Sequence, residues 1–185
     1  MQQQQYGAYL TQLTRFPHWF PVNVYLVQEA DSLTLIDTGI AGCERAILAT
    51  AQQIGKPITR IVLTHMHIDH IGSLDALHAA LPDAEILYSE RAKRTQAGVA
   101  RLADDEPLIK ARAGYPQTIL AATRTLQDGD MLGSLRVISC PGHSPGDIAL
   151  FDTRDNSLIA GDAFQTRGAV AVSGTVVWSF PFPSW

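Results

Sequence analysis

The chain has 185 residues and a formal net charge of −4, with 46% hydrophobic and 17% charged residues. This length and composition predict a single globular domain, residues 1–185, that can bury a sizeable core. The absence of a basic block argues against nucleic-acid or anionic-membrane partners, and no apolar run reaches the roughly 18 residues of a membrane helix. The first twenty residues lack the apolar stretch of a secretory signal, and the two cysteines match no metal-binding spacing. We therefore expect a cytoplasmic protein with reduced thiols.

Strand and helix patterns alternate in the N-terminal half. Residues 2–5 are a glutamine run, which predicts a frayed end. Apolar and β-branched runs predict four strands, of which the first two form a hairpin: residues 22–28, 32–36, 60–63 and 85–88. Helical spacing predicts three helices, the first ending before a glycine and the third capped by a serine: residues 44–54, 71–81 and 90–97.

Strand patterns dominate the C-terminal half, after an irregular region at residues 95–122 that contains glycine and proline. Functional residues often lie on such loops, so this region is a candidate cover for the functional site. Four of its residues could contact an anionic substrate, although solvated surface residues are the favoured interpretation: Arg101, Lys110, Arg112 and Tyr115. Five further strands are predicted, at residues 123–126, 135–139, 148–152, 157–160 and 170–173. This order of elements predicts a layered α/β protein with helices outside two sheets.

The strongest chemical signal follows the predicted strand at residues 60–63. Four candidate metal ligands fall within six residues there: His65, His67, Asp69 and His70. Imidazole and carboxylate groups are common zinc ligands, and a catalytic zinc lowers the pKa of its bound water to about 7. A histidine-rich surface loop is the simpler alternative, but three of the six histidines of the chain lie in this one segment. The segment therefore predicts a metal site.

Two more candidate ligands lie downstream, each after an apolar strand. His143 lies in a turn rich in proline and glycine, and Asp162 follows Gly161. Taken alone, each is more typical of an ordinary turn residue. Together with the first segment they predict one shared site, because a metal draws ligands from several strand ends.

In this order and spacing, the His65-x-His67-x-Asp69-His70 motif, the Gly142-His143 turn and Gly161-Asp162 resemble the metallo-β-lactamase superfamily. The resemblance is to its broad hydrolase branch, which includes glyoxalase II-like thioesterases and lactonases. Residues 35–39 also look like an early strand end of the family, and the resemblance extends over about residues 22–173. It implies an α/β fold, namely an αββα four-layer sandwich with the metal site at one edge of the two sheets.

The resemblance also implies a role for each matched residue. By this resemblance, two ions would be bound: the first by His65, His67 and His143, the second by Asp69 and His70, with Asp162 bridging both. Asp69 would in addition orient the nucleophilic water. Asp37 would support the ligand loop through hydrogen bonds, or would only shape the strand end. The implied cofactor is zinc, one or two ions per chain, with iron or manganese as alternatives.

The sequence departs from the family pattern near its end. The family supplies one more histidine ligand for the second metal, whereas no histidine follows His143. We therefore expect a C-terminally truncated fold with a weaker second metal site. The apolar residues 180–185 are expected to pack on the chain's own core or against a second copy, which would make a homodimer.

These residues predict a metal-dependent hydrolase whose zinc-activated water attacks an ester-, thioester- or lactone-type small molecule. Two alternatives stay open. A mononuclear iron dioxygenase would share His65, His143 and Asp162, and the missing histidine favours a catalytically degenerate metal-binding scaffold. The Asp162 carboxylate argues against a true β-lactamase, and the acidic net charge argues against a phosphodiesterase acting on RNA.

Overall fold

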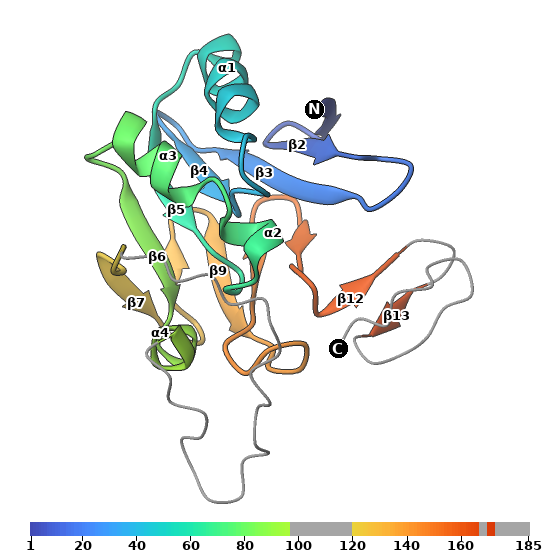
Figure 1. Ribbon diagram of the computed structural model, residues 1–185, viewed down its shortest axis with the longest axis vertical. Helices are drawn as coiled ribbons and strands as arrows, with labels where there is room; N and C mark the ends of the chain where they lie inside the picture. Colours follow the sequence, from blue (N-terminus) through green and yellow to red (C-terminus); the bar gives the residue numbers. More distant parts are fainter. Residues whose placement is uncertain (97–119, 167–169, 173–185) are drawn as a thin grey trace, which may run out of the picture.

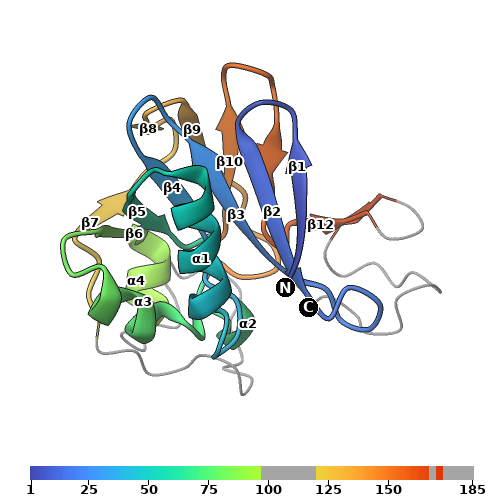
Figure 2. The same ribbon diagram turned by 90° about the horizontal axis from the view of Figure 1, so that it is seen from above.

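Two β-sheets, packed face to face, form the centre of the computed structural model, which describes residues 1–96, 120–166 and 170–172 (Figures 1 and 2). The larger sheet has the strand order β1-β2-β3-β4-β5-β6-β7, and the smaller has the order β11-β10-β9-β8. The strands of the larger sheet are β1 (Gln2–Tyr6), β2 (Leu10–Arg15), β3 (Val22–Gln28), β4 (Leu33–Ile36), β5 (Ile58–Val62), β6 (Glu85–Ser89) and β7 (Arg124–Leu126). Those of the smaller are β8 (Met131–Leu132), β9 (Leu135–Ser139), β10 (Ile148–Asp152) and β11 (Leu158–Ile159). A separate two-stranded ribbon pairs β12 (Phe164–Gln165) with β13 (Ala171–Val172).

Strand direction changes within the larger sheet. From β1 to β4 the neighbours are antiparallel, and from β4 to β7 they are parallel. The smaller sheet is antiparallel throughout. Because parallel strands end at the same edge, the loops after β4 and β5 meet at one place, which is where the candidate site forms.

Four helices are described: α1 (Glu44–Ile54), α2 (Ile68–Ile71), α3 (Leu74–Ala80) and α4 (Glu90–Gln96). They lie on the face of the larger sheet that points away from the smaller sheet (Figure 2). One apolar core fills the space between the helices and this sheet, and a second fills the space between the two sheets. The predicted arrangement of helices outside two sheets is thus confirmed, and the described residues supply one helical layer and both sheets. No described helix is long and apolar enough to cross a membrane.

The local sequence explains these elements. In β3, Val22, Val24 and Leu26 are buried and alternate with more exposed residues, as expected for a strand that covers a core on one face. Helix α1 buries Ile47 and Ala51 on one side and ends at Gly55, whose φ of 80° lets its N–H close the last turn on the Ala51 carbonyl.

Two sequence predictions are wrong. Residues 2–5 are not frayed: they form β1, which pairs with β2, a strand that the sequence did not predict. Backbone pairing within a hairpin forms this strand although all its side chains are exposed, so it leaves no hydrophobic pattern to read.

The predicted single helix at residues 71–81 is instead two helices, and the first begins inside the histidine motif at Ile68. The break lies at Gly72, where a side chain would collide with the backbone of Ala41 and Ile68 at 2.7 Å. The Gly72 N–H donates to the Gly39 carbonyl instead of extending a helix.

Candidate metal centre

The histidine motif occupies the turn between β5 and α2. β5 ends at Val62, and His67 is still extended, with φ −75° and ψ 154°, before helix α2 starts. His65 and His67 therefore project from an extended segment, whereas Asp69 and His70 lie on the first turn of a helix. This change of backbone geometry turns several side chains toward one place.

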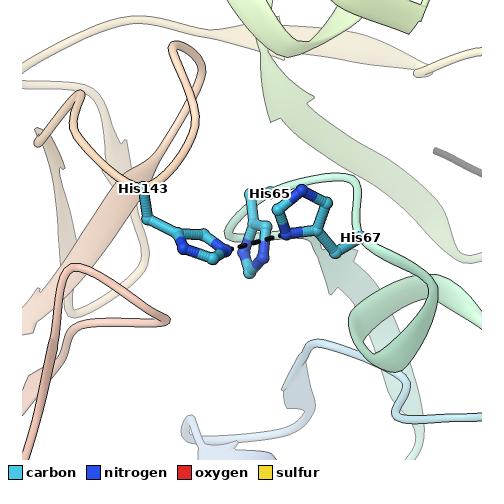
Figure 3. A group of neighbouring side chains, drawn as sticks. All are labelled: His65, His67 and His143. Atoms are coloured by element: carbon cyan, nitrogen blue, oxygen red, sulfur yellow. Dashed lines mark hydrogen bonds between the residues drawn. The ribbon is translucent and has the colours of Figure 1, made fainter. Parts of the chain in front are cut away.

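The first cluster consists of His65, His67 and His143. Their ligand nitrogens lie within 4.8 Å of one another. Nε2 of His143 is 2.8 Å from Nδ1 of His67, and the three rings converge from two separate parts of the chain (Figure 3). His143 comes from the turn between β9 and β10 in the smaller sheet, so this cluster joins the two sheets.

The second cluster consists of His65, His70 and Asp162, again with ligand atoms within 4.8 Å. Asp162 Oδ1 is 3.3 Å from His70 Nε2, and its Oδ2 is 3.4 Å from His143 Nε2 and 4.0 Å from His65 Nε2. Asp162 thus faces both clusters, the place that the sequence analysis expected for a bridging carboxylate. His65 belongs to both clusters, a sharing that the sequence analysis did not predict.

Asp69 lies at the rim of the second cluster. Its Oδ2 is 3.7 Å from His70 Nε2, and 24% of its side chain is exposed. It is outside both tight clusters, although its carboxylate faces the same space. The structure therefore brings together all six residues singled out from the sequence, with Asp69 the most peripheral.

Asp37 forms hydrogen bonds to the histidine motif, which is the first of the two roles suggested for it from the sequence. Its Oδ1 accepts the Thr64 backbone N–H, and its Oδ2 accepts the Thr64 hydroxyl, each at 2.8 Å. Oδ2 also lies 2.8 Å from His70 Nδ1. Since a bond to one ring nitrogen fixes the orientation of an imidazole, Asp37 directs His70 Nε2 toward Asp162.

Thr64 links the motif to the smaller sheet. Its hydroxyl is 3.1 Å from His65 Nδ1, and its carbonyl accepts the Ile148 N–H at 3.0 Å. Gly161 packs directly on it, because a Cβ there would lie 2.7 Å from the Thr64 hydroxyl. The turn that carries Asp162 can approach the motif closely for this reason.

Burial and charge set the protonation of these groups. Burial lowers the pKa of His65 well below its ordinary value, and neighbouring histidines lower it further. Burial and His143 lower the pKa of His67 to about 4. Both rings are therefore neutral at pH 7, the form that binds a metal.

The second cluster is electrostatically different. Burial lowers the pKa of His70, but the Asp37 and Asp162 carboxylates outweigh burial and raise it well above its ordinary value. Burial raises the pKa of Asp162, but His70 outweighs it and holds that pKa below its usual range. A cation bound here would take the place of the proton on His70.

Unsatisfied nitrogens indicate that the site suits a cation. Nε2 of His65 is buried and has no hydrogen-bond partner among the described residues. Such a group costs about 1–3 kcal/mol when it is left unpaired. Coordination of a divalent ion would satisfy it, and imidazole with carboxylate is a donor set that suits zinc or iron.

One pair of residues around the site was missed by the sequence analysis. Ser144 and Asp147 are buried in the turn of His143 and bond to each other. Their only sequence signal was membership of the same proline- and glycine-rich turn. The suggested substrate contacts Arg101, Lys110, Arg112 and Tyr115, and the apolar residues 180–185, lie outside the described residues.

A model of the metallo-beta-lactamase superfamily matches residues 18–183 of the chain. The chain is 46% identical over 175 residues to "Uncharacterized protein YobT" of Bacillus subtilis, which covers 94% of this chain and 75% of that protein. It is 31% identical over 157 residues to "Acyl-coenzyme A thioesterase MBLAC2" of Gallus gallus, covering 76% of this chain and 56% of that protein. Other relatives are named probable metallo-hydrolase and hydroxyacylglutathione hydrolase. Apart from YobT, the chain spans between 46% and 65% of the length of these curated relatives.

A solved structure, "Crystal structure of TTHA1623 in a di-iron-bound form", superposes with a TM-score of 0.67 at 30% identity. The match covers 93% of this chain and 79% of that one. These matches confirm the fold predicted from the motifs, and most of the chain takes part in them.

Proposed function

Because the chain belongs to the metallo-beta-lactamase superfamily, we propose that it is a metal-dependent hydrolase that cleaves a thioester or a related ester or lactone. The observation that supports this most is the convergence of two ligand clusters on the shared residue His65, with the Asp162 carboxylate facing both.

The ligand assignment follows from the two clusters. His65, His67 and His143 would hold one ion, and His70 with Asp162 would hold a second, next to Asp69. Bound divalent ions would lower the pKa of water and polarise the substrate carbonyl. We propose zinc, with two ions at full loading, and the di-iron form of the solved relative makes iron the main alternative.

The chain's own residues would orient the attacking water and the metal ligands. The Asp69 carboxylate, partly exposed at the rim, would accept a hydrogen bond from the attacking water and hold it against the substrate. Asp37 and Thr64 would keep His70 and His65 in place during the reaction, because both are buried and bonded to the ligands. The neutral His65 and His67 would remain ligands down to mildly acidic pH, because burial lowers the pKa of both rings.

The thioester preference comes from the named relatives. One is an acyl-coenzyme A thioesterase and another a hydroxyacylglutathione hydrolase. A cytoplasmic location and a homodimer remain predictions from the sequence.

The test combines metal content with turnover. Protein purified without chelator or affinity-column metal is analysed by plasma mass spectrometry and assayed for thiol release from acyl-thioesters. We expect up to two ions per chain and hydrolysis that chelation abolishes and added zinc restores. The variant His65→Ala removes a ligand of the three-histidine cluster and a member of the second cluster, so it should bind less metal and lose turnover.

Other outcomes would select the alternatives. Folded wild-type protein without metal would contradict the proposal. Metal without turnover of thioester, ester or lactone substrates would favour a non-catalytic scaffold. One iron per chain with oxygen consumption would favour a dioxygenase.

A further inference from the structure

The turn between β9 and β10 carries His143 and contains a buried carboxylate that the proposed reaction does not use. Asp147 is 4% exposed and Ser144 is 5% exposed. The Ser144 N–H donates to Asp147 Oδ2 at 2.7 Å, and the Ser144 hydroxyl donates to Asp147 Oδ1 at 2.5 Å. Both carboxylate oxygens are thus bound by the residue that directly follows His143.

The backbone of this turn is closed around the same pair. The Gly142 N–H donates to the Ser144 carbonyl at 3.2 Å, and the Cys140 N–H donates to the Asp147 carbonyl at 3.0 Å. Each of these bonds joins a residue before His143 to a residue after it. The imidazole therefore stands on a small loop whose shape depends on the Ser144–Asp147 contact.

The loop is also fixed to the larger sheet. The Ser89 hydroxyl donates to the Gly146 carbonyl at 2.6 Å, and a Cβ on Gly146 would lie 2.5 Å from the Ala92 nitrogen. On the other side, the Ile148 N–H donates to the Thr64 carbonyl of the histidine motif. Since the base of the loop is held at two points, the Ser144–Asp147 contact decides where its tip points.

The burial of the Asp147 carboxylate is energetically unfavourable. Burial raises the pKa of the Asp147 carboxyl, and the hydrogen bonds of Ser144 only partly offset it. The other buried carboxylate of the neighbouring strand, Asp152, is bound by the Arg154 guanidinium. Among the described residues, no such cation pairs with Asp147. A buried carboxylate without a cationic partner is destabilising by itself.

We infer that Asp147, through Ser144, is a positioning residue that fixes His143 in the geometry needed to complete the His65–His67–His143 metal cluster. The inference rests on the proposed function, because it assumes that this cluster holds an ion. It applies to that cluster alone, since His70 and Asp162 do not lie on the turn. Residues that orient metal ligands typically change metal affinity about 10- to 100-fold when they are replaced.

The test measures metal affinity rather than turnover. Asp147→Asn, Ser144→Ala and wild type are stripped of metal, their folding is checked by circular dichroism, and zinc is titrated against a chromophoric chelator. We expect one of the two zinc equivalents to weaken about 10- to 100-fold in Asp147→Asn. Ser144→Ala keeps its backbone N–H donor and should weaken it less. In the cobalt-substituted protein, the visible absorption of one ion should change, which a general loss of stability would not produce.

Asp152→Asn is the matched control, because it also removes a buried, hydrogen-bonded carboxylate, at the opposite end of β10. It should lower stability and leave both zinc affinities at the wild-type value. Unchanged zinc affinity and cobalt spectrum in Asp147→Asn, or in Ser144→Ala if Asp147→Asn does not fold, would overturn the inference. An equal loss of zinc affinity in Asp152→Asn would also overturn it.

In either case the proposed function would stand as long as the wild type binds metal and turns over substrate. Wild-type protein that binds no metal would overturn both, whereas metal binding without turnover would leave this inference intact.

Discussion

Asp37 combines two roles that the sequence could not separate. Its φ of 58° places it in the left-handed region, which aspartate tolerates better than most residues, so it does shape the end of β4. Its carboxylate also binds the Thr64 backbone, the Thr64 hydroxyl and His70. Replacing one oxygen by an amide N–H₂ group removes an acceptor while keeping the shape.

We therefore predict that Asp37→Asn lowers the affinity for the ion at His70 about 10- to 100-fold. The released ring would no longer be held with Nε2 toward Asp162. Zinc titration against a chelator measures this. Thr64→Ser, which keeps the hydroxyl that donates to Asp37, is the control and should bind zinc like the wild type. Equal affinity in Asp37→Asn and wild type would show that Asp37 only shapes the turn.

The residues of the metal centre differ in how visible they are in the amino-acid sequence. His65, His67, Asp69 and His70 are recognisable because four candidate ligands are concentrated in one short segment. Asp147 is not, because an aspartate in a turn has the same sequence signature whether it is solvated or buried. Only its 4% exposure distinguishes the two.

At the scale of elements, the turn after β10 is held to the larger sheet by one arginine. The Arg154 guanidinium donates to both oxygens of Asp152, at 2.9 and 2.6 Å, and to the Gln28 carbonyl at 2.7 Å. It also stacks 3.7 Å from the centre of the Tyr9 ring. This residue therefore connects β10 with the end of β3 and with the loop between β1 and β2.

Replacement of this arginine should give a pH-dependent loss of stability. Burial raises the pKa of Asp152, but the hydrogen bonds and charge of Arg154 outweigh it and hold the pKa below its ordinary value. The stabilisation is thus present above the unfolded pKa of about 4 and is lost as the pH falls through the folded pKa. We predict that Arg154→Met lowers the free energy of unfolding at pH 7 by about 2 kcal/mol, and that the difference from wild type shrinks below about pH 4.

Urea unfolding of both metal-free proteins at several pH values measures this difference. Arg60→Met, which removes a long, partly buried hydrogen bond of 3.4 Å to the neutral Thr34 hydroxyl, is the control and should show no pH-dependent change in stability. A difference between Arg154→Met and wild type that stays constant from pH 7 to pH 3 would mean that lost packing, not the ion pair, causes the effect.

The prediction of elements succeeded where burial leaves a periodic pattern. Strands at residues 22–28, 135–139 and 148–152 agree with the structure, because their apolar residues face a core. The failures occur where backbone contacts dominate. β1 has only exposed side chains, and the break at Gly72 results from close approach to the chain at Ala41.

At the scale of the whole molecule, the candidate metal centre connects the two sheets. His65, His67 and His70 follow β5 of the larger sheet, whereas His143 and Asp162 follow strands of the smaller one. Bound ions would therefore stabilise the contact between the two sheets. They would bind the folded chain and not the unfolded one, because the ligands come from segments that are far apart in sequence.

We predict that chelation lowers the midpoint of thermal unfolding. A ligand at about 1,000 times its dissociation constant adds about 4 kcal/mol per site, which corresponds to roughly 8–16 °C for a chain of this size. Thermal scans of zinc-loaded and chelated protein measure the shift. In His143→Ala the shift should be smaller, because one of the two clusters is incomplete. Identical midpoints with and without metal in the wild type would contradict a site that spans both sheets.

The sequence by itself determined the family, the layered fold and the six candidate ligands, because these depend on residue types in a short, specific order. Only the tertiary structure showed that His65 is shared by two clusters, that Asp162 faces both, and that Asp37 holds His70. It alone identified Ser144 and Asp147 as a buried pair beneath His143. The physical reason is that distances between residues from different strands, and the burial of a polar group, are set by packing of the two sheets and leave no local pattern in the chain.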